Sequence, residues 1–351
     1  MIRVTTNGTM RNYKSSLMRT SNSLNLARDK VLSQSNYTSY AEDPAAATQA
    51  FKLRRAFSRT NAQLESTKAL NKKFSTACDA LNSIKTDLAD GQAKISALAG
   101  LNDANASGRQ PLGEVLESSA ESIVQVMNSQ YGSSFIFGGK DSLGDAPFQL
   151  ETAEDGSKFI TYRGVRVDAD PDDDPEEYAK LKAMSQESSY VDIGSGLTEV
   201  DGKLITSSAF DGALNGINFI GYGTDEDGDP MNMGSVMLEL SAIFKRCDAT
   251  TGAWASTEDQ EAATRLTGKL TDSIDEITNQ WTSLDGRTSY LSTSEDRLTL
   301  AADNLNEQIL GIEQVDMASA LTDFSWAQYC YNAALKVGNS ILSQSLIDYM
   351  N

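Results

Sequence analysis

The chain has 351 residues, with 30 Lys and Arg against 49 Asp and Glu, and a net charge of −19. Such an acidic balance argues against nucleic acid as a partner, because phosphate binding requires a basic surface. Histidine is absent, which disfavours both acid–base catalysis near neutral pH and metal binding.

Residues 9–35 are predicted to form the first helix, because apolar residues recur there at every seventh position. The row consists of Met10, Leu17, Leu24 and Val31, with Tyr13 beside it. The first sixty residues hold 10 Lys and Arg against 3 Asp and Glu, a net charge of +7. The first helix is therefore basic and amphipathic.

A second helix is predicted from Pro44 to about Leu101. Asp43 can cap its start, and proline is favoured at the first helical position. Two heptad rows predict the side that is buried in a helical bundle. These rows are Phe74, Leu81, Leu88 and Ile95, and Ala77, Ile84, Gly91 and Leu98.

A third helix is predicted over residues 112–131, followed by a β-hairpin at 133–148 with glycine turns. Residues 151–230 then carry 6 Lys and Arg against 19 Asp and Glu, a net charge of −13. Strands are expected at 159–167, 190–193 and 217–222. We expect these residues to form a β-rich insert that folds separately and contacts the helices mainly through residues 135–148.

Two acidic runs in the insert are weak candidates for a cation site. Residues 168–174 are rich in Asp, and Asp225, Asp227 and Asp229 match the first three ligand positions of an EF-hand. The match then fails, because Pro230 and Val236 stand where that motif has Gly and Glu. A solvated acidic loop is the favoured interpretation.

Helices resume at about residue 232, with segments predicted at 236–247, 257–284 and from 285 nearly to the end. Residues 285–351 have a net charge of −6, which favours pairing with the basic first helix. We expect an antiparallel pair that brings Leu17 and Leu24 near Leu335 and Leu342. The last helix is apolar on more than one face, which predicts burial by neighbouring molecules.

The predicted fold is mainly α: a long antiparallel coiled-coil or helical-bundle shaft formed by both chain ends, with a β-hairpin and a small β-rich inserted outer domain. Residues 1–40 with 311–351 form the terminal domain, 41–150 with 231–310 the shaft, and 151–230 the insert. The candidate assembly interface consists of Tyr13, Leu17, Leu24, Val31, Tyr331, Leu335, Ile341, Leu342 and Leu346.

No catalytic, cofactor-binding or metal-binding motif is found: the chain lacks a dinucleotide fingerprint, a phosphate loop and a nucleophile elbow. We therefore expect no enzyme activity, no cofactor and no metal. The start of the chain lacks the apolar region of a secretory signal. No stretch has the length of a membrane span, so no membrane partner is expected.

Four places in the sequence carry a resemblance to a known family. They are residues 41–47 (AEDPAAA), 134–139 (SFIFGG) with 146–148 (APF), 315–318 (VDMA), and 334–338 (ALKVG) with 345–349 (SLIDY). These motifs resemble the flagellin superfamily of bacterial flagellar proteins, and within it the hook–filament junction group. The first is similar to the phrase that opens the family's long second helix, and the second resembles the hairpin of junction proteins. The third resembles the start of the family's final helix, and the fourth its terminal signature.

The resemblance implies a structural protein that joins the hook to the filament by helical self-assembly. Its implied partners are flagellin, the neighbouring hook-associated protein, copies of itself and an export chaperone. It also implies type III export without a cleaved signal, an extracellular location at the hook–filament junction, and terminal helices that line a tube and are disordered before assembly.

Two alternatives stay open. A minor flagellin would form the filament itself, although the polar residues 33–38 lack the glycine-centred turn that flagellins usually carry. A carboxylate-dependent enzyme or a calcium-binding module in residues 151–230 belongs to a different class.

Overall fold

The chain divides into two units in a computed structural model. The terminal unit comprises residues 1–61 and 299–351, and the central unit comprises residues 62–298. Residues 6–350 are described except 38, 154–155, 195, 197, 201–202 and 205–208.

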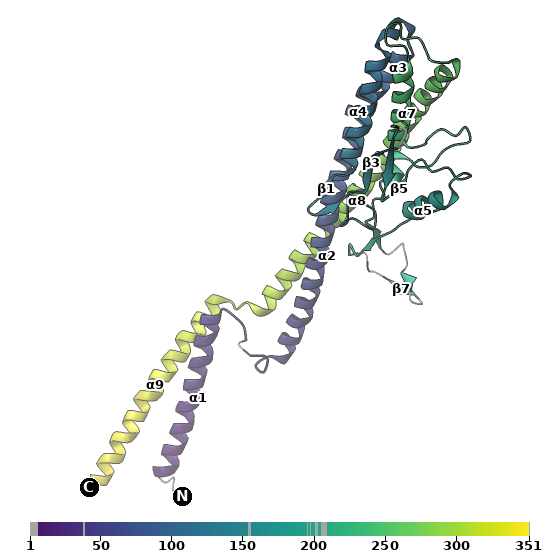
Figure 1. The fold of residues 1–351 in the computed structure, drawn as a ribbon. Coiled ribbons are helices and arrows are strands. Elements are labelled where there is room, and N and C mark those ends of the chain that lie inside the picture. Colours follow the sequence, from purple (N-terminus) through teal and green to yellow (C-terminus); the bar gives the residue numbers. More distant parts are fainter. Residues whose placement is uncertain are drawn as a thin grey trace. The chain divides into compact units, whose positions relative to one another are not determined.

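The terminal unit is built on an antiparallel pair of helices, α1 (Thr6–Ser33) and α9 (Met317–Met350), which lie side by side (Figure 1). Where the pair begins, Ser35 forms a bridge with Gln314, and the Asn36 side chain donates to the Ile312 and Gln314 carbonyls at 3.0 Å each. These contacts fix how the two chain ends are aligned. The predicted pairing of the ends is confirmed.

The long helix α8 (Thr257–Glu313) continues where the sequence predicted a break between residues 284 and 285. The chain leaves the helix only at residues 314–316. Asp316 then accepts bonds from the Ala318 amide at 3.0 Å and the Ser319 hydroxyl at 3.1 Å. The Ala318 amide, with the Ser319 contacts, holds the pKa of Asp316 below its usual range. A side chain that caps free amides starts a new helix, so the break lies here.

Helix α2 (Pro44–Ser83) starts where the sequence predicted, with the Asp43 carboxylate accepting from the amides of Ala45 at 3.1 Å and Ala46 at 2.9 Å.

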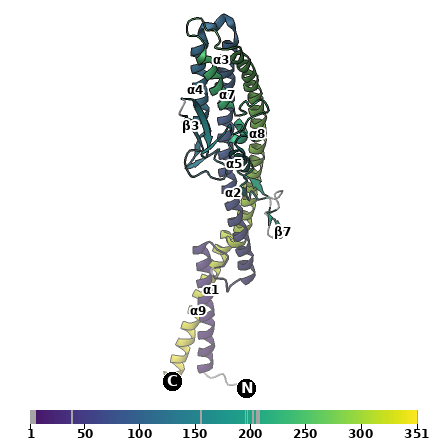
Figure 2. The same ribbon diagram turned by 45° about the vertical axis from the view of Figure 1, so that its right-hand side comes forward.

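In the central unit α2 and α8 run side by side (Figure 2). The amide of Asn71 donates to Glu295 at 3.0 Å, and the Lys85 ammonium lies 5.7 Å from the Trp281 ring centroid. The seam buries Phe74, Ala77, Leu81 and Ile84, as the two heptad rows predicted, and it also buries Leu284 and Leu291 of α8.

A π-helix, η1 (Ile84–Ala93), separates α2 from α3 (Lys94–Leu101) and changes which side of the helix is buried. In a π-helix the backbone hydrogen bonds join residue i to residue i+5, so its turns are wider than those of an α-helix. A Cβ on Gly91 would lie 2.7 Å from the Thr86 carbonyl oxygen, so glycine suits this turn.

Three heptad positions within and beyond η1 are consequently not buried as predicted. Gly91 is exposed, and Ile95 and Leu98 are 61% and 52% exposed. The buried positions are instead Ala89, Ala93 and Ala97. The strict seven-residue row assumed a continuous α-helix, and the wider π turns rotate the following residues out of that register.

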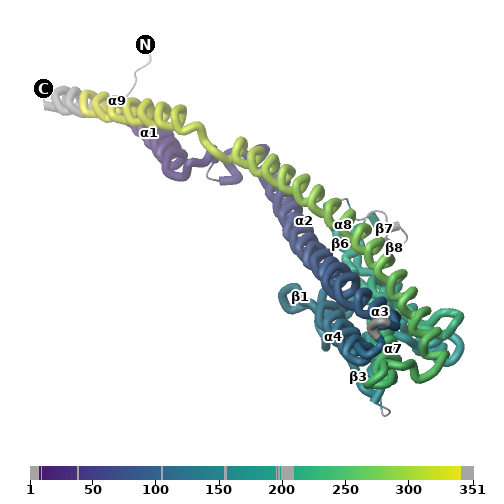
Figure 3. Tube along the Cα trace, turned by 90° about the horizontal axis from the view of Figure 1, so that it is seen from above, coloured from purple at the N-terminus to yellow at the C-terminus, as the bar shows by residue number. Residues whose placement is uncertain are grey.

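Helices α4 (Arg109–Met127) and α7 (Met233–Arg246) complete the helical layer beside α3 (Figure 3). Helices α4 and α7 approach closely at Gly113. A Cβ at this position would lie only 3.0 Å from the Ser241 carbonyl oxygen, so glycine permits the close contact. The buried side of α4 includes Leu116, Ala120, Ile123 and Met127, and that of α7 includes Met233, Val236, Leu240 and Phe244.

A buried arginine, Arg109, holds the end of α3 and the chain that follows it. Arg109, 2% exposed, donates to the carbonyls of Gly100 at 2.7 Å and of Gly252, and to the Asp103 carboxylate at 2.7 Å. Its guanidinium lies 4.0 Å from the Trp254 ring centroid. The short 3-10 helix η2 (Asp103–Gly108) and the end of α3 are held by these contacts.

The insert combines short strands with two helices. Its main sheet has the antiparallel order β3 (Phe148–Thr152), β4 (Lys158–Tyr162), β5 (Val165–Arg166). Its two-stranded pairs are β6 (Tyr190–Val191) with β9 (Phe210–Asp211), and β7 (Glu199–Val200) with β8 (Lys203–Leu204). Before the insert, β1 (Gln130–Tyr131) pairs with β2 (Ser134–Phe135), so the hairpin lies at 130–135 rather than at 133–148 as predicted, and Phe148 pairs with Tyr162 instead. The helices are α5 (Pro175–Ser185) and α6 (Ile217–Ile220).

Two expectations about the insert are wrong. The strand expected at 217–222 is helical over Ile217–Ile220. The insert also shares its core with α4 and α7 rather than folding around its own. Ile160, Tyr162, Leu181 and Ile217 belong to the same buried cluster as the helical residues. Burial raises the pKa of Tyr162 to about 12, and its hydroxyl donates to the Phe137 carbonyl at 3.1 Å.

The π-helix yields a paired test of which side of α3 is buried. Ala97→Asp places an unpaired carboxylate in the core and should lower the free energy of unfolding by about 3 kcal/mol or more. Ile95→Asp changes an exposed position and should cost under about 1 kcal/mol. Urea unfolding followed by circular dichroism measures both. If Ile95→Asp lowered the free energy of unfolding more than Ala97→Asp, the heptad register would continue through α3.

Candidate assembly interface

The predicted interface residues of α1 line its contact with α9 without being fully covered. Tyr13, Leu17, Leu24 and Val31 are all half-buried, and no described side chain of α1 is fully buried. On α9, Tyr331 is half-buried and Leu335 is 43% exposed. The side chains of Ile341, Leu342 and Leu346 lie outside the described residues.

The register of the pair is set by a small residue opposite an aromatic one. Gly338 is buried against the Tyr13 ring, and any Cβ at position 338 would overlap the phenol. With Ser35 opposite Gln314 at the other end, Leu17 lies near Leu335, as expected. Leu24 lies opposite the helical turn around Ala327 rather than near Leu342. Because the two helices run antiparallel, a later residue of α1 faces an earlier residue of α9.

A groove with a volume of about 700 Å³ runs along α1 and α9. Arg19 and Lys30 line it from α1, and Asp316 and Asp323 line it from the other side. The aromatic rings of Trp326 and Tyr329 stack beside it, with centroids 5.9 Å apart and both side chains 67% exposed. Sequence reasoning missed this pair, although two large aromatic residues three positions apart on a helix share a face.

In the central unit, two cationic side chains from the shaft hold the insert at β9. The Arg287 guanidinium lies 4.8 Å from the Phe74 ring centroid and 5.3 Å from that of Phe210, and it donates to the Asp211 carbonyl. Lys73 donates to the Gly212 carbonyl at 3.3 Å. Burial lowers the pKa of both Arg287 and Lys73. The insert is thus fastened to α2 and α8, and the expectation of contact mainly through residues 135–148 is wrong.

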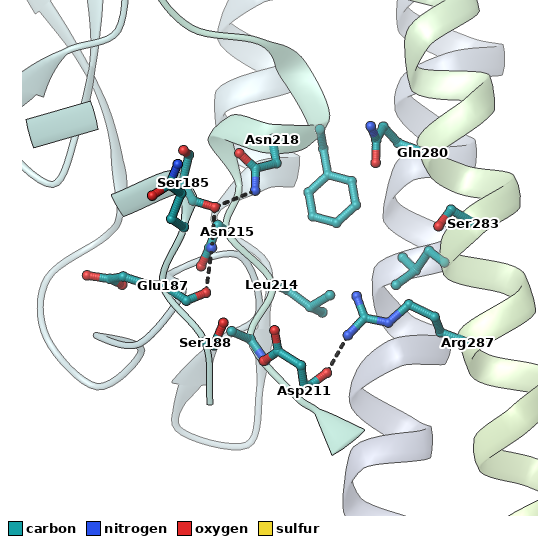
Figure 4. Close-up of a pocket in the computed structure, with 14 residues that line it drawn as sticks. Ser185, Glu187, Ser188, Asp211, Leu214, Asn215, Asn218, Gln280, Ser283 and Arg287 are labelled. Carbon is teal, nitrogen blue, oxygen red and sulfur yellow. Dashed lines mark hydrogen bonds between the residues drawn. The ribbon is translucent and has the colours of Figure 1, made fainter. Parts of the chain in front are cut away.

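A small polar pocket of about 210 Å³ lies beside this contact (Figure 4). Its amide side chains bond to backbone carbonyls of the insert. Asn215 donates to the Ser185 carbonyl at 3.0 Å and the Glu187 carbonyl at 2.9 Å, and Asn218 donates to the Ser185 carbonyl at 2.8 Å. These bonds order the chain between α5 and α6.

The acidic run 225–229 is tied to α8 rather than solvated as we expected. The Asp229 carboxylate, in a residue 4% exposed, accepts from Arg265 at 2.5 and 2.9 Å and from Lys269 at 2.5 Å. Asp225 also pairs with Lys269. The Arg265 guanidinium, with Lys269, holds the pKa of Asp229 below its usual range. These carboxylates already have protein cations as partners.

The second acidic run, residues 168–174, is bonded to the residue that precedes the first run and to its own backbone. Asp170 accepts from the Thr224 hydroxyl at 2.5 Å and from the Asp172 and Asp173 amides at 2.7 and 3.2 Å. Within the described residues, no group of three or more Cys, Asp and Glu side chains is arranged to hold a metal ion. In the same part of the chain, none of the helices combines the length and apolarity that crossing a bilayer requires.

Arg287 provides a test of how the insert is held. Arg287→Ala removes two cation–ring contacts and a bond to a backbone carbonyl, and should lower the free energy of unfolding by about 2–3 kcal/mol. Amide exchange should rise first at residues 189–194 and 209–216. As a control, Arg246→Ala removes a pair with Asp259 in which the arginine is 55% exposed, and should cost under about 1 kcal/mol. Equal effects of both variants would contradict this role.

The Asp229 contact predicts a specific dependence on pH. Because the pKa of Asp229 is lower in the folded chain than in the unfolded chain, its ion pairs stabilise the fold above about pH 4. This contribution is lost as the pH falls further. Asp229→Asn should therefore cost about 1–2 kcal/mol at pH 7 and almost nothing at pH 2. Urea unfolding at both pH values measures the difference, and a cost that does not change with pH would contradict the assignment.

The comparisons with known proteins concern the fold. No protein-family profile matches the chain, and no curated protein matches its sequence. A putative flagellar hook-associated protein from Vibrio parahaemolyticus aligns with a TM-score of 0.54 and 15% identity, over 77% of this chain and 99% of that one. Bacillus cereus FlgL aligns with a TM-score of 0.46 and 16% identity, over 74% and 99%. Over about three quarters of its length, the chain therefore has the fold of the putative hook-associated protein.

Proposed function

We propose that this chain is a structural protein of the bacterial flagellum that joins the hook to the flagellin filament by helical self-assembly. The observation that carries the proposal is the antiparallel pair of chain ends, whose apolar seam is only half-buried. The fold shared with a putative hook-associated protein supports it. The half-covered seam also argues for a structural role over an enzyme, because such surface is stabilised by neighbouring chains.

In this proposal the three predicted domains have different places in a tube. Residues 1–40 with 311–351 line the inner wall, where copies of the chain complete the burial of Tyr13, Leu17, Leu24 and the α9 residues. Residues 41–150 with 231–310 form the shaft. Residues 151–230, with a net charge of −13, face outward, since unpaired carboxylates resist burial and like charges limit lateral aggregation.

The proposed partners are flagellin on one side, the neighbouring hook-associated protein on the other, and copies of this chain. An export chaperone would bind the subunit before secretion through the type III pathway, without cleavage of a signal. A minor flagellin is the second candidate, because both kinds of protein polymerise. The two differ in product: a junction protein forms a short zone between two other proteins, whereas a flagellin forms long filaments alone.

Immunogold electron microscopy of isolated flagella tests both the location of the protein and the role of the α1 seam in its incorporation. Label on wild-type flagella should lie at the border between hook and filament. Leu24→Asp places a charge in the seam and should reduce incorporation more than about tenfold. Ser15→Asp introduces the same side chain at an exposed position of α1 and should leave incorporation unchanged.

Three results would contradict the proposal. Label along the whole filament would favour a minor flagellin, and absence of label from flagella would remove the flagellar role. Equal incorporation of Leu24→Asp and wild type would show that the seam is not an assembly surface.

A further inference from the structure

We propose that the π-helix η1 is a conformational switch between two packings of residues 84–101. In the observed packing Ala93 and Ala97 are buried. In the second packing η1 is α-helical, α3 is turned about its own axis, and Ile95 and Leu98 are buried in their place. The whole segment lies within the central unit, and π turns inside long helices frequently lie at functional sites.

The sequence carries an apolar row for each packing. A continuous α-helix from Ile84 would place Leu88, Ile95 and Leu98 on one side, because residues three, four or seven positions apart share a face. The observed packing uses a row of small residues at intervals of four, Ala89, Ala93 and Ala97. It leaves Ile95 61% exposed and Leu98 52% exposed, although both side chains would gain from burial.

Two contacts at the end of α3 select the row of alanines. A Cβ at Gly100 would overlap the Phe244 ring, so α3 approaches α7 with a glycine facing it. The Arg109 guanidinium holds the same residue by donating to the Gly100 carbonyl at 2.7 Å. Neither contact involves a residue of η1. The choice between the two packings is therefore made at the end of α3, and η1 accommodates it.

Gly91 is the residue whose side chain distinguishes the two packings. In η1 a Cβ at position 91 would lie 2.7 Å from the carbonyl oxygen of Thr86, five residues earlier. This close approach belongs to the π geometry, in which residue i+5 stacks on residue i. In an α-helix, alanine is more favourable than glycine. Gly91→Ala therefore disfavours the observed packing and favours the second one.

The switch determines whether an apolar patch is presented to solvent. Ile95 and Leu98 are three positions apart and share the exposed side of α3 in the observed packing. The second packing covers both side chains and exposes Ala97. Loss of the Arg109 contact with Gly100 favours the second packing, so a change at this end of the central unit removes the patch. The switch does not depend on the flagellar role.

Thiol labelling of the full chain with Ellman's reagent tests the switch. The two half-buried cysteines are first removed by Cys78→Ser and Cys330→Ser, and the buried third cysteine sets the background rate. A single cysteine is then introduced by Ile95→Cys, by Ala97→Cys or, as a reference, by Ala77→Cys. Position 77 precedes η1, is fully buried and stays buried in both packings.

Position 97 should react about tenfold faster than position 77, although both are fully buried in the observed packing, because a minor population exposes position 97. Adding Gly91→Ala should make position 97 react about tenfold faster again and position 95 about tenfold more slowly, with position 77 unchanged. Gly268→Ala is the matched control, since it makes the same change at an exposed glycine of α8 that has nothing within 4 Å of its Cβ position. It should leave all three rates within about twofold.

Four results would overturn the proposal. Equal rates at positions 97 and 77 in the otherwise wild-type chain would mean that only one packing is populated. Rates at positions 95 and 97 that Gly91→Ala leaves unchanged would mean that η1 does not convert. Faster reaction at position 97 without slower reaction at position 95 would indicate fraying of α3, and faster reaction at all three positions would indicate general loosening of the fold.

Discussion

The alignment of α1 against α9 is the constraint on which the terminal unit depends. The bridge between Ser35 and Gln314 and the contact of Tyr13 with Gly338 fix the two helices in register. Two helices alone can cover only one side of each other, and short helical pairs gain most of their stability from further packing. The seam is consequently half-buried along α1. A surface of this kind suits a chain whose ends are completed by other copies.

The helices could be predicted from the sequence because they depend on local signals: heptad rows, the cap at Asp43 and proline at position 44. The π-helix could not be predicted in this way, because a heptad row assumes a continuous α-helix. The seam fixes α2 near Phe74, while Arg109 fixes the end of α3 by binding the Gly100 carbonyl. The chain between these points adopts the wider turn, and the buried side moves from Ile95 to Ala97.

The attachment of the insert to α8 could not be predicted from the sequence either. Charge counts identified residues 151–230 as acidic, but they could not show that the cations of α8 bind there. Arg265 pairs with Asp229 over 36 positions of sequence, and Arg287 reaches the Asp211 carbonyl over 76. Interactions with backbone carbonyls leave no pattern in the sequence, because every residue has one. The half-buried positions of α1 could be predicted in contrast, since a seam between two helices requires apolar residues at regular spacing.

Amide hydrogen exchange on the free subunit tests most directly the claim that the chain ends require neighbours. We expect fast exchange over about the first and last forty residues, because their seams are incomplete. Exchange should be slow over residues 70–130 and 260–300, where the helices are buried on one another. After assembly, the terminal segments should become protected. Uniform slow exchange across the free chain would contradict the account, because it would show that the terminal unit is complete without a partner.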